Sequence, residues 1–200
     1  MVNWNGHTLT PMPHTGVEGQ SDEVVRVYKT GTLIPDTNTY ARVDGTDFHN
    51  GTIEVDVCGG LLPDAPEDSR GFIGITFRAA EDGREFECFY IRPTNGRGCA
   101  DPVRRSHGCQ YFSFPGYTFA YFRDFHITGF EGPVDTIALN EWCHIKAVVR
   151  GGTGKFYVND SLVLEVENLR HGPGLRGSVG LYVDNGTSGL FRNLRIAYDD

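Results

Sequence analysis

The sequence contains no long apolar run and no extended block of basic residues. A membrane-spanning helix needs about 20 consecutive apolar residues, and no stretch of this chain approaches that length. The formal net charge is -8, and no basic stripe is long enough to follow a phosphate backbone. The sequence therefore predicts neither a membrane span nor a nucleic acid partner.

The amino-terminal residues lack the charged start and the apolar segment of a secretory signal. As written, the chain is therefore expected in the cytoplasm. If Met1 replaces a signal that has been removed, a secreted protein is expected instead.

The five cysteines include no Cys-x-x-Cys pair, and the sequence has no His-x-His, no His-Glu-x-x-His and no acidic calcium-binding loop. We therefore expect no metal ion, and no organic cofactor is expected either. Cys99 and Cys109 could form a disulfide under oxidising conditions. The alternative is that all five cysteines are reduced and mostly buried.

Convincing helical periodicity is also missing. Glycine contributes 26 of the 200 residues and aromatic residues contribute 12%. This composition is typical of many short strands joined by tight turns. A single all-β domain, a sandwich or barrel spanning residues 1–200, is therefore expected.

Alternating apolar residues predict the central strands, at residues 48–59, 70–80 and 84–93. Further strands are expected at residues 22–30 and 40–43 and in several segments after residue 142, with a leading strand or arm over residues 1–21. If the three central strands are neighbours, one non-core face carries Glu54, Asp56, Thr76, Arg78, Tyr90 and Arg92. Arginine and tyrosine among small residues favour a binding groove over a plain solvated face.

Residues 93–115 form a predicted loop far longer than a hairpin needs, and long ordered loops are usually functional. Between Arg92 and Arg123 the chain has five arginines and one acidic residue, Asp101. Between Tyr111 and Phe125 eight of fifteen residues are aromatic. Guanidinium groups beside aromatic faces can bind a polar ring or an anion.

The carboxyl-terminal sixty residues resemble the closing half of concanavalin A-like jelly rolls. The similarity is carried by Trp142 and by residues 145–148, 156–159, 177–181 and 191–194, and residues 51–57 and 74–78 fit the same fold. The chain is most similar to laminin G-like and 3-keto-disaccharide hydrolase-like domains. This resemblance implies an antiparallel jelly-roll β-sandwich with the long loop inserted over its concave face. It also leaves open a structural calcium ion, held by backbone carbonyls and an aspartate.

The segment from Glu54 to Asp56 resembles part of the Glu-x-Asp-x-x-Glu motif of retaining glucanases with this fold. The third motif position is Gly59, so the acid of that mechanism is missing and the motif is not carried over.

The candidate catalytic residues are His107, Asp56, Glu131 and Tyr90. His107 suits a general base because neighbouring arginines would lower its pKa. Asp56 and Glu131 could flank a sugar as a pair of acids. The candidate substrate-binding residues are Arg78, Arg92, Asn95, Arg97, Arg105, Gln110, Tyr111, Tyr117 and Arg123. The alternatives are an exposed loop histidine, arginines held in ion pairs, and tyrosines packed in the core.

The leading hypothesis is a carbohydrate-active enzyme, a hydrolase or a lyase, that acts on a glycosidic or related sugar bond by acid/base catalysis. The first alternative is a lectin-like module that binds sugar without turnover. The second is a cofactor-free cyclase or isomerase that acts on a non-sugar metabolite. The expected partner is a small molecule or an oligosaccharide, and the oligomeric state is left open.

Overall fold

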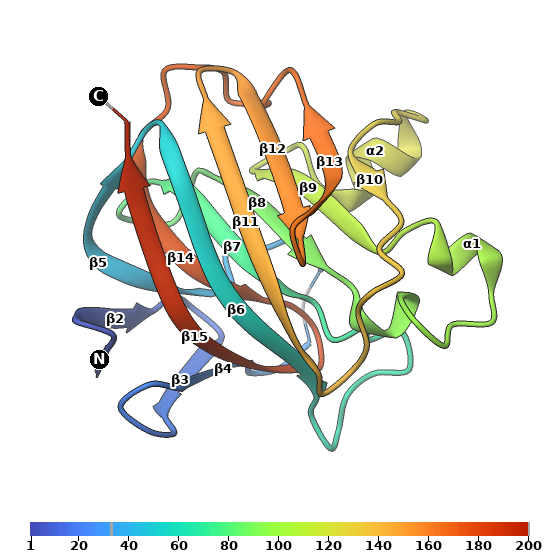
Figure 1. The fold of residues 1–200 in the computed structure, drawn as a ribbon, viewed down its shortest axis with the longest axis horizontal. Helices are drawn as coiled ribbons and strands as arrows, with labels where there is room; N and C mark the ends of the chain where they lie inside the picture. The colour runs from blue at the N-terminus through green and yellow to red at the C-terminus, as the bar shows by residue number, and fades with distance from the viewer. Residues whose placement is uncertain (33, 200) are drawn as a thin grey trace.

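The computed structural model describes residues 1–32 and 34–199, which form two antiparallel β-sheets packed face to face (Figure 1). In spatial order, the eight-stranded sheet contains β1 (Val2–Trp4), β2 (His7–Pro11), β5 (Tyr40–Phe48), β14 (Gly177–Val183), β7 (Ile73–Ala79), β8 (Phe86–Ile91), β9 (Cys109–Phe114) and β10 (Glu131–Gly132). The seven-stranded sheet contains β13 (Ser161–Val166), β12 (Thr153–Val158), β11 (Trp142–Arg150), β6 (Gly51–Leu61), β15 (Thr187–Tyr198), β4 (Val25–Lys29) and β3 (Thr15–Gly19).

Three short helices lie between β8 and β10: η1 (Pro93–Asn95), α1 (Pro102–Arg105) and α2 (Phe119–Asp124). Figure 1 shows α1 and α2 at the side of the sandwich away from the carboxyl terminus. Within the described ranges, no helix is long and apolar enough to span a bilayer.

The main core lies between the sheets and contains the alternating residues that predict the strands. Ile53, Val55 and Val57 of β6 are fully buried there, while the partly exposed Glu54 and Asp56 alternate with them along the strand. Each such aliphatic side chain contributes about 1.5–3 kcal/mol when it is buried. The period-two pattern of this strand is therefore a consequence of one covered face.

The outer face of the eight-stranded sheet is also covered, by a second cluster rich in aromatic residues. Phe122 of α2 is buried in this cluster and stacks on Phe130 at 4.5 Å between ring centroids. Every residue of β7 and β8 is buried because both of their faces are covered. The predicted jelly-roll sandwich, with an insertion over one face, is therefore confirmed.

Two expectations are wrong, one about the central strands and one about the loop predicted after them. β6 pairs with β11 and β15, whereas β7 and β8 belong to the other sheet, so the predicted shared face of Asp56 and Tyr90 does not exist. Residues 93–115 are not one loop either, because β9 begins at Cys109 and pairs with β8. Both faces of β9 are buried, so its sequence lacks the polar-apolar alternation that marks a half-exposed strand. The amino-terminal arm forms β1, β2 and β3.

All five cysteines are free thiols in the structure, so the Cys99–Cys109 disulfide is not formed. Cys109 is buried in the main core, and this burial raises the pKa of its thiol to about 12. Cys99 is partly exposed, and the other four cysteines are buried. The alternative of reduced, mostly buried cysteines is confirmed.

Candidate functional site

A cavity of about 340 Å³ lies over the outer face of the eight-stranded sheet, where β8 ends and β7 begins. The segment between β8 and β10 forms one side, and the loops before β5 and β7 form the other. This volume falls in the range of small-ligand sites, roughly 300–1,000 Å³. The lining residues are Pro35, Asp68, Arg70, Phe72, Tyr90, Arg92, Asn95, Val103, Arg104, His107, Phe119 and Arg123.

Arg92 organises the buried wall of the cavity and is only 4% exposed. Its Nη1 donates to Glu131 Oε2 at 2.7 Å, and its Nη2 donates to the Tyr90 hydroxyl at 3.1 Å and to Gln110 Oε1. The Tyr90 hydroxyl also donates to Gln110 Oε1, at 3.0 Å. Burial raises the pKa of Tyr90 well above its usual value, so this hydroxyl keeps its proton at neutral pH.

His107 lies beside the same carboxylate. Its Nδ1 is 3.2 Å from Glu131 Oε2, but the two are not aligned as a hydrogen bond, and Nδ1 has no other partner among the described residues. Burial lowers the pKa of His107, the charge of Glu131 opposes this, and the charges of Arg123 and Arg92 add to the lowering. The predicted lowering of the His107 pKa is confirmed, although burial is a larger cause than the arginines. A neutral imidazole can accept a proton.

Arg70 and Arg104 line the cavity and are held by neutral oxygens. Arg70 Nη1 donates to the carbonyl oxygens of Glu67 and Ser69, each at 3.0 Å. Arg104 donates from Nε to Asn95 Oδ1 at 3.2 Å and from Nη2 to Thr94 Oγ1 at 3.0 Å. Carbonyl and hydroxyl oxygens orient these guanidinium groups without neutralising them.

Asp36 is a fully buried carboxyl close to this wall that the sequence reasoning missed. Its Oδ2 accepts from the backbone N–H of Phe119, and its Oδ1 has no partner among the residues described. Burial, followed by the charge of Asp184, raises the pKa of Asp36 from 3.8 to about 7. No local sequence signal marks this residue, because its burial comes from distant segments folding over a loop.

Most of the predicted site residues meet at this cavity. Tyr90, Arg92, Asn95, His107 and Arg123 line it. Gln110 and Glu131 both accept from Arg92, so they belong to the same cluster. Arg123 Nη2 lies 3.0 Å from Glu131 Oε1, which leaves this carboxylate shared by two arginines.

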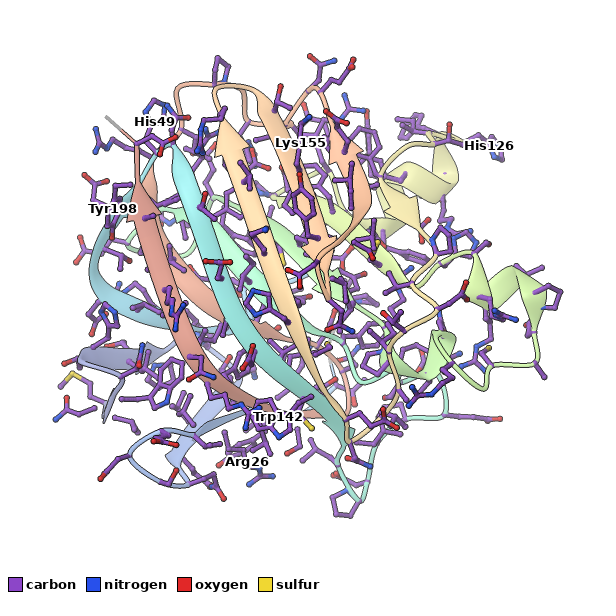
Figure 2. All side chains as sticks on the ribbon, viewed as in Figure 1. Arg26, His49, His126, Trp142, Lys155 and Tyr198 are labelled. Carbon is purple, nitrogen blue, oxygen red and sulfur yellow. The ribbon has the colours of Figure 1, made fainter. Side chains whose placement is uncertain are left out.

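Asp56 lies on the seven-stranded sheet, away from the cavity. Its Oδ1 is 2.8 Å from His144 Nδ1, and its Oδ2 accepts from Asn193 at 2.8 Å. On this sheet, Trp142, labelled in Figure 2, packs against Arg192, whose guanidinium carbon is 4.2 Å from the ring centroid. The hypothesis that Asp56 and Glu131 flank one sugar is therefore wrong, because β6 is in the other sheet.

Arg78 and Tyr111 are buried structural residues. Arg78 adopts φ 54°, which interrupts the alternation of β7, and it donates to the carbonyl oxygens of His49 at 2.8 Å and Gly151 at 2.8 Å. Tyr111 belongs to the main core, and its hydroxyl contacts Glu87. The structure places neither residue at the cavity.

Three further candidates lie outside the cavity lining. Arg97 forms an ion pair with Glu141, and Arg105 Nη2 lies 2.7 Å from Asp135 Oδ1. For these two arginines the alternative of ion pairs holds. The ring of Tyr117 packs on that of Tyr121, with 5.2 Å between centroids.

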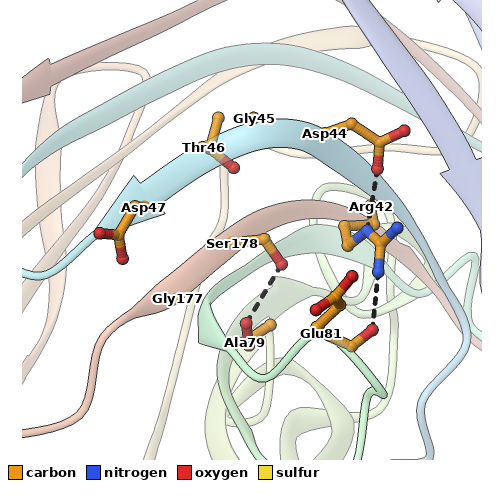
Figure 3. A pocket seen from close by; sticks show the side chains of 9 residues that line it. All are labelled: Arg42, Asp44, Gly45, Thr46, Asp47, Ala79, Glu81, Gly177 and Ser178. Carbon is orange, nitrogen blue, oxygen red and sulfur yellow. Dashed lines mark hydrogen bonds and ion pairs between the residues drawn. The ribbon is translucent and has the colours of Figure 1, made fainter.

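Other hollows of the surface differ in character from this cavity. One of about 410 Å³ shares His107 and Arg123 with the cavity and includes His126, which Figure 2 labels near α2. Another, of about 390 Å³, lies between β5 and β14 (Figure 3). There Arg42 donates to Asp44 and to the carbonyl oxygen of Glu81, so its cation is already neutralised. In the described part of the chain, no three His, Cys, Asp or Glu side chains gather as metal ligands.

No protein-family model matches the sequence, and no curated protein sequence matches it. Solved structures do match. The carbohydrate-binding module CBM66 from Bacillus subtilis is 17% identical with a TM-score of 0.55, over 96% of this chain and 91% of that one. A protein of unknown function with a galectin-like fold, also from Bacillus subtilis, is 13% identical with a TM-score of 0.58, over 94% and 88%.

The chain has their sandwich fold. The β-glucanase of Bacillus licheniformis, 14% identical with a TM-score of 0.53 over 92% of this chain and 82% of that one, shares it as well. At these identities the likeness concerns the fold alone. The concanavalin A-like resemblance is therefore supported for the fold, and the narrower likeness to laminin G-like or 3-keto-disaccharide hydrolase-like domains stays a prediction.

Proposed function

We propose that this protein is a carbohydrate-active enzyme whose active site is the cavity at the end of β8. The observation that carries the proposal is the convergence of His107 and the Arg92 cluster on one small-ligand cavity. His107 acts as the general base, and the Tyr90 hydroxyl, which accepts from Arg92 and donates to Gln110, helps to hold the Arg92 guanidinium in the cavity wall.

The shape of the site limits the ligand. Beyond the cavity, the outer face of the eight-stranded sheet is filled by Phe112, Phe122 and other aromatic side chains of the chain itself. An extended polysaccharide therefore cannot lie along this face, and a ligand of one or two rings fits better. Glu131 is bound by two arginines, so it positions them and is a poor candidate for a free base.

A carbohydrate-binding module without turnover is the second candidate function. It is favoured by the likeness in fold to CBM66, a protein described as a carbohydrate-binding module. The cyclase or isomerase on a non-sugar metabolite stays a third prediction. The apolar side chains that share the cavity, such as Phe72 and Phe119, would suit it.

His107→Ala distinguishes the first two functions. Mono- and disaccharides are incubated with the protein, turnover is followed by mass spectrometry, and binding is followed by calorimetry. The matched control is His144→Ala, since both histidines are partly exposed and both lie near a carboxylate, but His144 is on the other sheet. Turnover lost in His107→Ala, with binding retained, supports the enzyme. Binding without turnover in the parent protein supports the module, and neither binding nor turnover refutes both.

A further inference from the structure

We propose that the sugar ligand carries an oxyanion and that Arg70 and Arg104 bind it. This inference rests on the proposed function and adds its substrate class: an acidic saccharide with a carboxylate or phosphate ester, in preference to a neutral one.

The charges around the cavity leave a cationic excess. Four guanidinium groups line it, and Asp68 is the one carboxylate among the described lining residues. Glu131, which binds Arg92 and Arg123, supplies a second negative charge. Four positive charges against two negative charges leave an excess of two. If Asp36 is ionised as well, an excess of one remains.

The excess is concentrated on Arg70 and Arg104. In the described ranges, neither guanidinium takes part in an ion pair within 4.0 Å, and their hydrogen-bond partners are carbonyl, amide and hydroxyl oxygens. By contrast, Arg97 and Arg105, in the same arginine-rich region, each have a carboxylate partner. Among the described residues, Arg70 and Arg104 are thus the cavity arginines without an ion-pair partner, and the charge of Asp68 acts on Arg70 from a greater distance.

Grouping these cations has a cost. Burial, followed by the charge of Arg104, lowers the pKa of Arg70; the charge of Asp68 opposes this, and the charge of Arg92 adds to the lowering. A guanidinium offers paired donors in a fixed plane, which match the oxygens of a carboxylate or phosphate. A bound oxyanion would relieve this repulsion and occupy the donors that neutral oxygens leave free.

Calorimetry with glucose, glucuronate and glucose 6-phosphate tests the proposal and distinguishes the two oxyanions, with inorganic phosphate and acetate as non-sugar probes. Arg70→Gln and Arg104→Gln are compared with Arg97→Gln, an exposed arginine outside the cavity. We expect at least one acidic sugar to bind about tenfold or more tightly than glucose. We also expect each cavity variant to lose about tenfold of that affinity, Arg97→Gln to lose none, and Arg70→Lys to retain part of it.

If glucose and the acidic sugars bind equally, and the cavity variants bind them with unchanged affinity, the proposal of an oxyanion on the ligand is wrong and the proposed carbohydrate function stands. Phosphate or acetate binding that depends on Arg70, with no saccharide bound, overturns the carbohydrate function and keeps the oxyanion site. No binding of any probe overturns both. Urea denaturation of each variant identifies any that fail to fold, and Arg70→Lys keeps the charge in the same fold.

Discussion

Replacing Asp36 by Asn removes the buried titrating group beside the cavity. The folded-state pKa of about 7 lies above the ordinary value of 3.8. Between these values the folded protein keeps the proton that the unfolded chain releases, so the free energy of unfolding falls as pH rises. The difference is about 3 pH units, which corresponds to roughly 4 kcal/mol at one unit per 1.36 kcal/mol.

The asparagine side chain has nearly the shape of the neutral acid, and its amide oxygen can accept from the Phe119 N–H as Asp36 Oδ2 does. The free energy of unfolding of Asp36→Asn should therefore not decrease with rising pH as that of the parent protein does. Between pH 5 and pH 8 the stability of the variant relative to the parent should rise by about 3 kcal/mol. Any cost of burying the amide without a partner is the same at every pH.

Urea denaturation at several pH values measures this difference. Asp64→Asn, at an exposed carboxyl, is the matched control and should leave the profile unchanged. A gap between Asp36→Asn and the parent that stays constant from pH 5 to pH 8 would refute the reasoning, because it would mean that Asp36 titrates alike in the folded and unfolded states.

Two further predictions concern residues outside the cavity. Tyr111→Phe should destabilise the fold by about 2 kcal/mol, because its hydroxyl contacts the buried Glu87 and accepts from the Arg170 N–H at 2.7 Å, and it should leave ligand affinity unchanged. Urea denaturation and calorimetry check both parts, and weaker binding without lost stability would contradict the assignment of Tyr111 to the core. A thiol reagent should modify Cys99 rapidly in the native protein and all five cysteines in denaturant. No reactive thiol in the native state and three in denaturant would instead indicate a Cys99–Cys109 disulfide.

The single-face strands could be predicted from the sequence because their alternation reflects local geometry. Ile53, Val55 and Val57 mark β6 for this reason. β9 could not be predicted in this way. Tyr111 faces the main core while Phe112 belongs to the second cluster, and a strand buried on both faces has no polar-apolar alternation. The sequence also does not show which sheet contains β6, because strands that follow one another in the chain need not be neighbours in a sheet.

The cavity was only partly predictable. The arginine-rich segment located Arg92, Asn95, His107 and Arg123 correctly, because these residues lie close together in the chain and the insertion carries them to one place. Arg70 and Asp36 come from distant loops, and no local pattern connects them to that segment.

By itself, the sequence determined the sandwich and the segment that covers it, because alternation, turn residues and an excess of arginine are local properties of the chain. Only the tertiary structure decided which charges meet. It separated Asp56 from Glu131 by placing β6 in the other sheet. It also paired Arg97 and Arg105 with carboxylates, whereas among the described residues Arg70 and Arg104 have no ion pair within 4.0 Å. Charge neutralisation depends on distance in space, which the order of residues does not specify.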